Sequence, residues 1–227
     1  MKIKLVHLLT DIEATREKAS IQSLSPLKEY GIEYTPHINE IYRGDGHIKN
    51  IPIYTGNHGP GHYGLFQSFK RAIEEEFTED LDGIIICECD CIITVPHSRF
   101  AEMAKEAVTV CKDHLINYVS FGAPGSVDGL VWSPVIEEHP NYLSFYLTDK
   151  IIMTHCIMFP RHSREYLLRQ LKTGTWDGLD IWLNWAFRTA TNIPPKRFAV
   201  SKETVTYQHE GMSIIEGKIY DGKRYIE

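Results

Sequence analysis

An apolar run at positions 82–94, which two carboxylates interrupt, limits the folds open to this chain more than any other stretch. The run opens with Asp82-Gly83, a turn signal, and continues with three successive isoleucines. Apolar, β-branched runs bounded by turn signals predict a strand that is buried on both faces, as is typical of a parallel sheet. We therefore expect an α/β fold organised around this strand.

Glu88 and Asp90 place two like charges inside the run. Side chains on a strand alternate with period two, so both carboxylates are predicted to share one face. Like charges about 7 Å apart in a buried strand are costly unless a cation or several donors lie between them. Ligands gather at the carboxyl ends of strands in open α/β sheets, so we place the pair near such an end. Two interpretations remain open: a metal site, or acids hydrogen-bonded to loop amides at a fraying strand end.

The same alternation predicts that Cys87, Cys89 and Cys91 share the opposite face of the strand. Together with His58 and His62 they suggest zinc. Neighbouring thiolates on one flat face do not converge tetrahedrally, however. We therefore interpret these cysteines as core residues.

Composition limits the class of protein. A chain of 227 residues with 43% hydrophobic and 24% charged residues suits one α/β domain with a sizeable core. The net charge of −6 argues against a large nucleic-acid footprint, so a nucleic-acid acceptor is possible but not favoured. Five cysteines fit a reducing compartment, and no stretch approaches the roughly 20 apolar residues of a membrane span. We expect a cytoplasmic protein without a transmembrane segment.

The order of the predicted elements indicates the sheet topology. Residues 3–9 predict a strand, residues 14–30 a helix that Pro26 kinks and Gly31 ends, and residues 32–37 the next strand. This order is the opening of a doubly wound, Rossmann-like sheet. Further helices are expected at 65–77, 98–112, 161–172 and 177–188, further strands at 116–121, 142–147 and 151–159, and a long loop at 38–64.

A glycine motif supports an alternative function. Gly59-Pro60-Gly61-His62-Tyr63-Gly64 has the G-x-G-x-x-G form of a dinucleotide fingerprint, and Glu88 follows at about the distance of a ribose-binding acid. Polar residues precede the motif where a strand is needed, and the fingerprint leaves Asp90 unused. An NAD-type oxidoreductase that uses Gly59, Gly61 and Gly64 remains an alternative.

Six segments carry a family resemblance through their order and spacing. They are Leu8-Leu9-Thr10-Asp11 with Arg16, Ser20, Leu24 and Gly31; Gly61-His62-Tyr63-Gly64-Leu65-Phe66; Ile84-Ile85-Ile86-Cys87-Glu88-Cys89-Asp90; Thr154-His155-Cys156-Ile157; Trp176-Asp177-Gly178-Leu179-Asp180; and Gln208-His209-Glu210-Gly211. In this order they resemble the nucleotide-sugar glycosyltransferases of the GT-A fold. The lipopolysaccharide-type (family 25-like) branch, whose strand ends in Glu-Asp-Asp, is the nearest. The resemblance covers most of the chain and implies a mixed, mostly parallel sheet flanked by helices.

The resemblance also implies a metal site and a DxD-like motif. Family members bind a nucleoside diphosphate sugar through Mn²⁺ or Mg²⁺, which maps onto Glu88 and Asp90, with Asp90 as the direct ligand. Cys89 stands where the family has its middle acid. His209 matches a histidine that completes the metal shell in many members; the competing interpretation is an exposed loop side chain.

Catalytic and donor-binding residues follow from the same resemblance. Inverting members carry an acid at the start of a late helix, where it takes a proton from the acceptor hydroxyl; Asp180 matches it. Asp177 then caps that helix, and the alternative is that Asp180 only complements the helix dipole. Thr10 and Arg16, just after the first strand, match positions near the nucleotide, although Arg16 is equally explained as an exposed helix charge.

The function expected from this resemblance is transfer of a sugar, with inversion, from a nucleotide donor to a hydroxyl acceptor. The preferred donor is UDP-linked and serves as the co-substrate, and a glycan is one class of acceptor. Residues 1–227 form one domain, with 1–115 as the nucleotide-sugar-binding half and 116–227 as the acceptor and catalytic half. A metal-dependent nucleotidyl or phosphoryl enzyme, or a catalytically silent binding module, would use the same carboxylates. Trp176, Trp182 and Trp185 supply either a sugar-stacking face or core packing.

Overall fold

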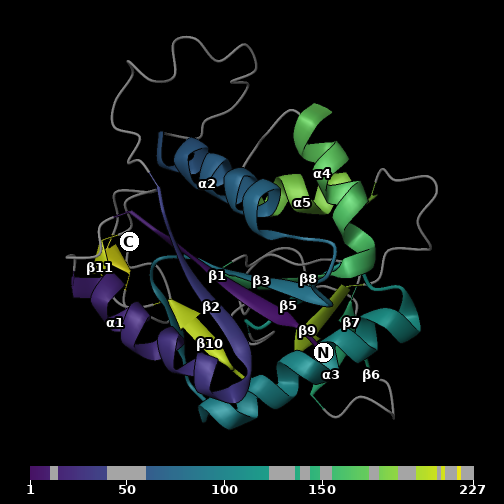
Figure 1. Cartoon of the computed structure of the whole chain (residues 1–227), viewed down its shortest axis with the longest axis horizontal. Coiled ribbons are helices and arrows are strands. Elements are labelled where there is room, and N and C mark those ends of the chain that lie inside the picture. The colour runs from purple at the N-terminus through teal and green to yellow at the C-terminus, as the bar shows by residue number, and fades with distance from the viewer. Residues whose placement is uncertain are drawn as a thin grey trace.

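The computed structural model in Figure 1 describes residues 1–10, 15–39, 60–122, 136–138, 144–148, 155–173, 179–188, 198–208, 211–212 and 219–220. Its main sheet has eight strands in the order β2-β1-β3-β8-β5-β9-β7-β6. They are β1 (Ile3–Leu9), β2 (Ile32–Ile38), β3 (Gly83–Cys87), β5 (Val119–Ser120), β6 (Ile136–Glu138), β7 (Phe145–Thr148), β8 (Cys156–Pro160) and β9 (Phe198–Ser201).

The sheet is mixed, as predicted. β1 pairs in parallel with β2 and with β3, and β5 pairs in parallel with β9. β8 is antiparallel to both β3 and β5, and β7 is antiparallel to both β6 and β9. Only β7 and β8 of this sheet are therefore reversed, and the other strands run in one direction. Because β8 lies between β3 and β5, strands from both predicted halves of the chain form one sheet.

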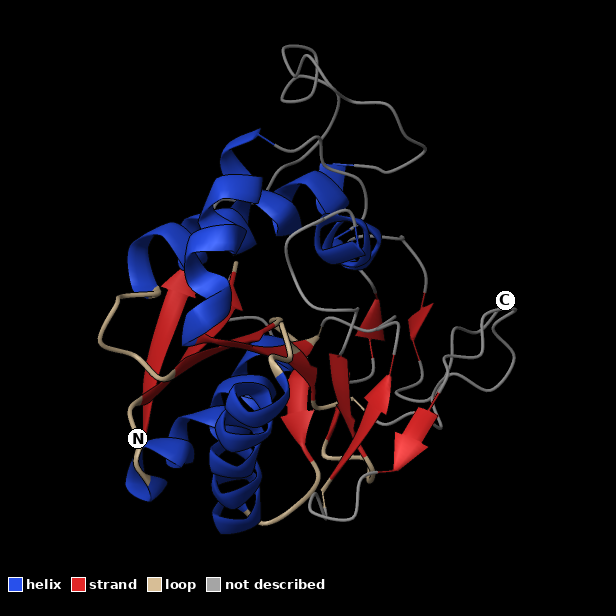
Figure 2. Cartoon of the chain, turned by 90° about the vertical axis from the view of Figure 1, so that its right-hand side faces the viewer, coloured by secondary structure: helices blue, strands red, loops and turns tan. Residues whose placement is uncertain are grey.

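Helices cover both faces of the sheet (Figures 1 and 2). One hydrophobic cluster joins the sheet to α1, the 3-10 helix η1 and α3, and a second cluster joins the opposite face to α2, α4 and α5. The α/β fold class predicted from the sequence is confirmed. The helices are α1 (Thr15–Leu24), η1 (Ser25–Tyr30), α2 (Pro60–Glu76), α3 (His97–His114), η3 (Arg161–Ser163), α4 (Arg164–Thr173) and α5 (Leu179–Arg188).

Pro26 and Gly31 shape the connection between β1 and β2. The helix predicted at 14–30 is divided into α1 and η1, and Pro26 lies in the first turn of η1, where its missing N–H costs little. Gly31 ends η1 with φ at 82°, in the left-handed region that favours glycine, and its N–H donates to the carbonyls of Leu27 and Lys28. β2 then begins at Ile32 and pairs with β1 from Ile3 onward.

The prediction of one long strand at 82–94 is wrong. β3 ends at Cys87, and the chain turns at Cys89 and Asp90. It resumes as β4 (Cys91–Ile93), which pairs with β10 (Thr206–Gln208) in a separate two-stranded sheet. A further small sheet pairs β11 (Gly211–Met212) with β12 (Ile219–Tyr220).

This break overturns the prediction of shared faces. The turn interrupts the two-residue alternation between Cys87 and Cys91, so the side chains of the run no longer share two flat faces. Cys87 and Cys91 are both fully buried, whereas Cys89 is half-buried. Glu88 and Asp90 accordingly lie in a turn and not on a strand face.

The structure decides between the two predicted roles for Trp182. Trp182 is 1% exposed and packs edge-on against Phe66, with ring centroids 5.1 Å apart, so it belongs to the core. The side chain of Trp185 and the whole of Trp176 lie outside the described residues.

Within the described ranges, every helix is too short or too polar to span a bilayer.

Candidate functional site

The carboxyl ends of three neighbouring strands meet at one edge of the sheet. β1, β2 and β3 are parallel, and their last residues are Leu9, Ile38 and Cys87. The N–H of Asn39 donates to the carbonyl of Leu9 across 2.8 Å, which ties the ends of β1 and β2 together. This is the edge at which open α/β sheets bind ligands.

Glu88, Cys89 and Asp90 form a turn at this edge, which we call the acidic turn. The N–H of Cys91 donates to the carbonyl of Glu88 across 3.1 Å and closes it. The N–H of Glu88 donates to the carbonyl of His155 across 2.9 Å, so the residue that precedes β8 holds the start of the turn. All three turn residues are half-buried, and the Oδ1 atom of Asp90 is buried. The sequence therefore placed both carboxylates correctly near a strand's carboxyl end, although the turn was not foreseen.

A buried polar network lies beneath the acidic turn. His7, inside β1, has its Nδ1 3.0 Å from the hydroxyl of Tyr34 and its Nε2 2.9 Å from the hydroxyl of Ser20. Ser20 donates to the carbonyl of Cys91 across 2.6 Å. The network thus links β1, β2 and α1 to the residue that ends the turn. Sequence reasoning missed His7, and the signal that could have found it is a lone histidine within an apolar strand.

Burial determines the charge state of His7. The ring is 0% exposed, and desolvation lowers the pKa of His7 to about 4. His7 is therefore neutral at physiological pH in the folded protein. A neutral ring donates through one nitrogen and accepts through the other, which suits its two hydroxyl partners.

Stability is expected to fall as the pH falls from about 6.5. The unfolded chain binds a proton at His7 near pH 6.5, whereas the folded chain resists it until about pH 4. Between pH 6.5 and pH 5 this linkage removes about 1.5 kcal/mol from the free energy of unfolding. Urea unfolding at both pH values, on the wild type and on His7→Gln, measures it. Glutamine keeps a donor and an acceptor but does not titrate, so the variant is expected to lose about 1.5 kcal/mol less than the wild type between the two pH values. Equal slopes for the two proteins would contradict the prediction.

Thr10 follows β1 and is held by Glu17 of α1. The hydroxyl of Thr10 donates to Glu17 Oε1 across 2.6 Å, and its N–H donates to Oε2 across 3.1 Å. Glu17 is 1% exposed, and these bonds solvate its carboxylate. The structure thus anchors Thr10 at the carboxyl end of β1; its predicted contact with the donor stays a prediction.

The structure locates only some of the other predicted site residues. Arg16 lies in α1 and Asp180 in the first turn of α5, but the side chains of both are outside the described residues. Asp177 and His209 lie entirely outside them. Of the glycine motif, Gly61 and Gly64 lie inside α2, and Gly59 is outside the described residues. The roles of these residues stay predictions.

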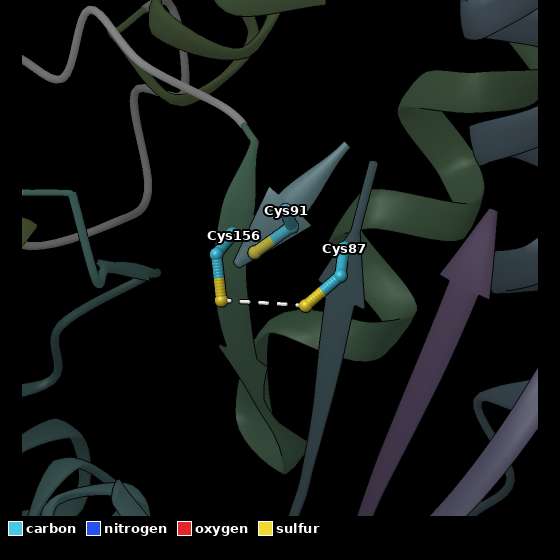
Figure 3. A group of neighbouring side chains, drawn as sticks. All are labelled: Cys87, Cys91 and Cys156. Carbon is cyan, nitrogen blue, oxygen red and sulfur yellow. Dashed lines mark hydrogen bonds between the residues drawn. The ribbon is translucent and has the colours of Figure 1, made fainter. Parts of the chain in front are cut away.

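Three cysteines converge next to the acidic turn (Figure 3). The sulfur atoms of Cys87, Cys91 and Cys156 lie within 4.8 Å of one another, and all three residues are 0% exposed. The expectation that cysteines of this run do not converge is therefore wrong. The turn folds Cys91 back toward Cys87, and β8 supplies Cys156 from the neighbouring strand.

Burial and hydrogen bonds shift the pKa values of the three thiols in different directions. Burial raises the pKa of the Cys87 and Cys91 thiols, so both are protonated at neutral pH. Burial opposes ionisation of Cys156 too, but hydrogen bonds from both thiols and from Thr206 lower the pKa of Cys156 to about 6. Cys87 donates to Cys156 across 3.4 Å.

Comparison with known proteins shows a likeness of fold. No family model and no curated protein matches the sequence. Among solved structures, A197 from STIV aligns with a TM-score of 0.50 at 12% identity, over 100% of this chain and 93% of that one. A glycosyltransferase involved in glycosylation of the major capsid of PBCV-1 aligns at 0.47 and 11% identity, over 88% and 81%. A mutant Drosophila galactosyltransferase 7 in complex with manganese, UDP-Gal and xylobiose aligns at 0.41 and 8%, over 92% and 71%. At 12% identity the match to A197 shows a shared fold and nothing about function.

Proposed function

We propose that this chain is a glycosyltransferase of the GT-A type that moves a sugar from a nucleoside diphosphate donor, preferably UDP-linked, to a hydroxyl acceptor with inversion. The observation that carries the proposal is the acidic turn, which places two carboxylates directly after the central strand β3, beside the carboxyl end of β1. In open α/β sheets, substrates and other ligands bind at the carboxyl ends of the strands. The resemblance of the sequence to lipopolysaccharide-type members supports the same assignment.

The carboxylates suit a hard divalent cation. Mn²⁺ and Mg²⁺ prefer oxygen ligands, and Mg²⁺ is usually held by one or two carboxylates together with substrate phosphates. Asp90 and Glu88 supply such a pair, and Asp90 has one oxygen in a buried position. His209 is proposed as a further ligand. When bound, the cation would supply Lewis-acid assistance to the departing diphosphate.

The chain's own residues hold the site in place. The network of His7 and Ser20 supports the acidic turn from below, and the carbonyl of His155 fixes its first residue. Preorganised ligands of this kind do not have to reorganise during the reaction. Thr10 and Arg16 are proposed to contact the nucleotide from the ends of β1 and α1.

Asp180 is proposed as the general base. It lies in the first turn of α5, where the helix dipole favours an ionised carboxylate. In inversion, this carboxylate takes the proton of the acceptor hydroxyl while the oxygen attacks the anomeric carbon and the nucleoside diphosphate leaves on the opposite face. Asp177 is proposed to cap the helix and so to fix the position of Asp180.

Donor hydrolysis with and without a chelator tests the proposal. A panel of nucleotide sugars is incubated with the protein and Mn²⁺, and release of the nucleoside diphosphate is measured. We expect release from a UDP-sugar and a fall of about a hundredfold or more with EDTA, because a catalytic cation contributes several kcal/mol. Binding of NAD without a cation would favour the oxidoreductase alternative instead. Release of a nucleoside monophosphate together with a sugar 1-phosphate would favour a nucleotidyl or phosphoryl enzyme.

A further inference from the structure

We infer that Cys87, Cys91 and Cys156 form a binding site for one soft, thiophilic cation, best matched by Cu⁺. Each thiol comes from a different strand: β3, β4 and β8. Their sulfur atoms lie within 4.8 Å of one another, and Figure 3 shows the three side chains converging on one region between the strands. This inference does not depend on the proposed sugar transfer, which uses the carboxylates of Glu88 and Asp90 and none of these three thiols.

The distances between the sulfurs favour a shared ion over a disulfide. Metal–sulfur bonds of about 2.3 Å place two thiolates on the same ion roughly 3.8 to 4 Å apart. The observed values, 3.4 Å for Cys87 to Cys156 and at most 4.8 Å within the group, bracket that spacing. A disulfide would require the two sulfurs to approach to about 2.05 Å and would leave the third thiol unused. One ion satisfies all three sulfurs with smaller movements.

The number and softness of the ligands select the cation. Thiolates are soft ligands and favour Cu⁺ and Zn²⁺ over hard cations such as Mg²⁺. Structural zinc is almost always four-coordinate, whereas the group found in the described part of the chain offers three ligand atoms. Three sulfurs in an apolar core therefore fit Cu⁺ better. On binding, each S–H replaced by a Cu–S bond releases its proton to solvent, and no electrons are exchanged.

The ion would fix the base of the acidic turn. Cys87 and Cys91 immediately flank the turn, and Cys156 follows His155, whose carbonyl holds Glu88. A cation on these three sulfurs would thus join both ends of the turn to β8.

Competition for Cu⁺ tests the inference. Reduced protein is titrated under argon into the Cu⁺ complex of bicinchoninate, whose colour reports the ion that it retains. We expect the wild type to withdraw one Cu⁺ per chain, and Cys156→Ala to bind at least about 100-fold more weakly. Cys111→Ala is the matched control, because Cys111 is a fully buried cysteine of α3 outside the group and its loss is expected to leave binding unchanged.

A second measurement covers the case in which Cys156→Ala does not fold. X-ray absorption on the wild-type protein loaded with Cu⁺ counts the ligands directly, and three sulfur scatterers at about 2.3 Å are expected. Failure of the wild type to compete for Cu⁺ would overturn the inference. So would fewer than three sulfur ligands, an equal loss of binding in Cys111→Ala, or an intact mass that shows the loss of two hydrogens to a disulfide.

Discussion

Asp90→Asn is expected to lower metal-dependent release of the nucleoside diphosphate by about a hundredfold or more. The substitution keeps the shape of the side chain and removes its charge, so the cation loses its proposed direct ligand. A cation contributes several kcal/mol to stabilising a departing diphosphate, and each 1.36 kcal/mol corresponds to a factor of ten in rate. Steady-state hydrolysis of a UDP-sugar over a range of Mn²⁺ concentrations measures the effect.

The control for this experiment is Asp113→Asn. Asp113 is an exposed carboxylate near the end of α3, and the same chemical change there is expected to leave the rate within a factor of two or so, as for most surface substitutions. Circular dichroism compares the folding of both variants with the wild type. If Asp90→Asn remains folded and keeps the wild-type rate and the wild-type dependence on Mn²⁺, then the acidic turn does not hold the metal and the proposed function fails.

Trp182→Ala is expected to cost about 4 kcal/mol of unfolding free energy. Trp182 is 1% exposed, and its ring packs edge-on against Phe66 and Phe69, with centroids 5.1 and 6.4 Å away. Truncation of a fully buried tryptophan removes this burial and leaves a cavity, which typically costs 3 to 5 kcal/mol, or roughly 10 °C in melting temperature at this chain length. Urea and thermal unfolding measure the change.

Trp182→Phe separates packing from polar contacts. Among the described residues, the indole Nε1 of Trp182 has no hydrogen-bond partner, so phenylalanine removes no hydrogen bond that the structure describes. We expect a loss of about 1 to 1.5 kcal/mol, because an aromatic ring still fills most of the space. Equal losses in the two variants would show that the cavity is not the cause. Because Trp182 lies in the same helix as Asp180, Trp182→Ala also tests whether the packing of α5 affects catalysis.

Local patterns predicted the elements of the first crossover well. Pro26 and Gly31 determine only the conformation of their own neighbourhood. The proline ring fixes φ where α1 gives way to η1, and the left-handed backbone of Gly31 ends η1. β1, with its apolar pattern, is found at Ile3–Leu9, where the sequence placed it. The sequence also predicted that Glu88 and Asp90 lie at the carboxyl end of a buried strand.

The break in the central run could not be read from its own residues. Apolar residues on both sides of Glu88 and Asp90 favour one strand, but β3 ends at Cys87, and residues 91–93 pair with a strand from far along the chain. β10 pairs Thr206 with Ile93 and Gln208 with Cys91, and this pairing draws β4 out of the main sheet. The turn therefore lies between residues that pair in the main sheet and residues that pair in the two-stranded sheet.

Propensity, turn chemistry and periodicity act over short stretches of chain, and they were enough to predict the α/β class, the first strand and crossover, and two carboxylates near the carboxyl end of a buried strand. They did not predict that these carboxylates lie in a turn, that His7 and Ser20 support it, or that Cys156 joins Cys87 and Cys91. Each of these depends on contacts between different strands and helices of the fold. Such contacts are selected by the packing of the whole fold, which no short pattern encodes.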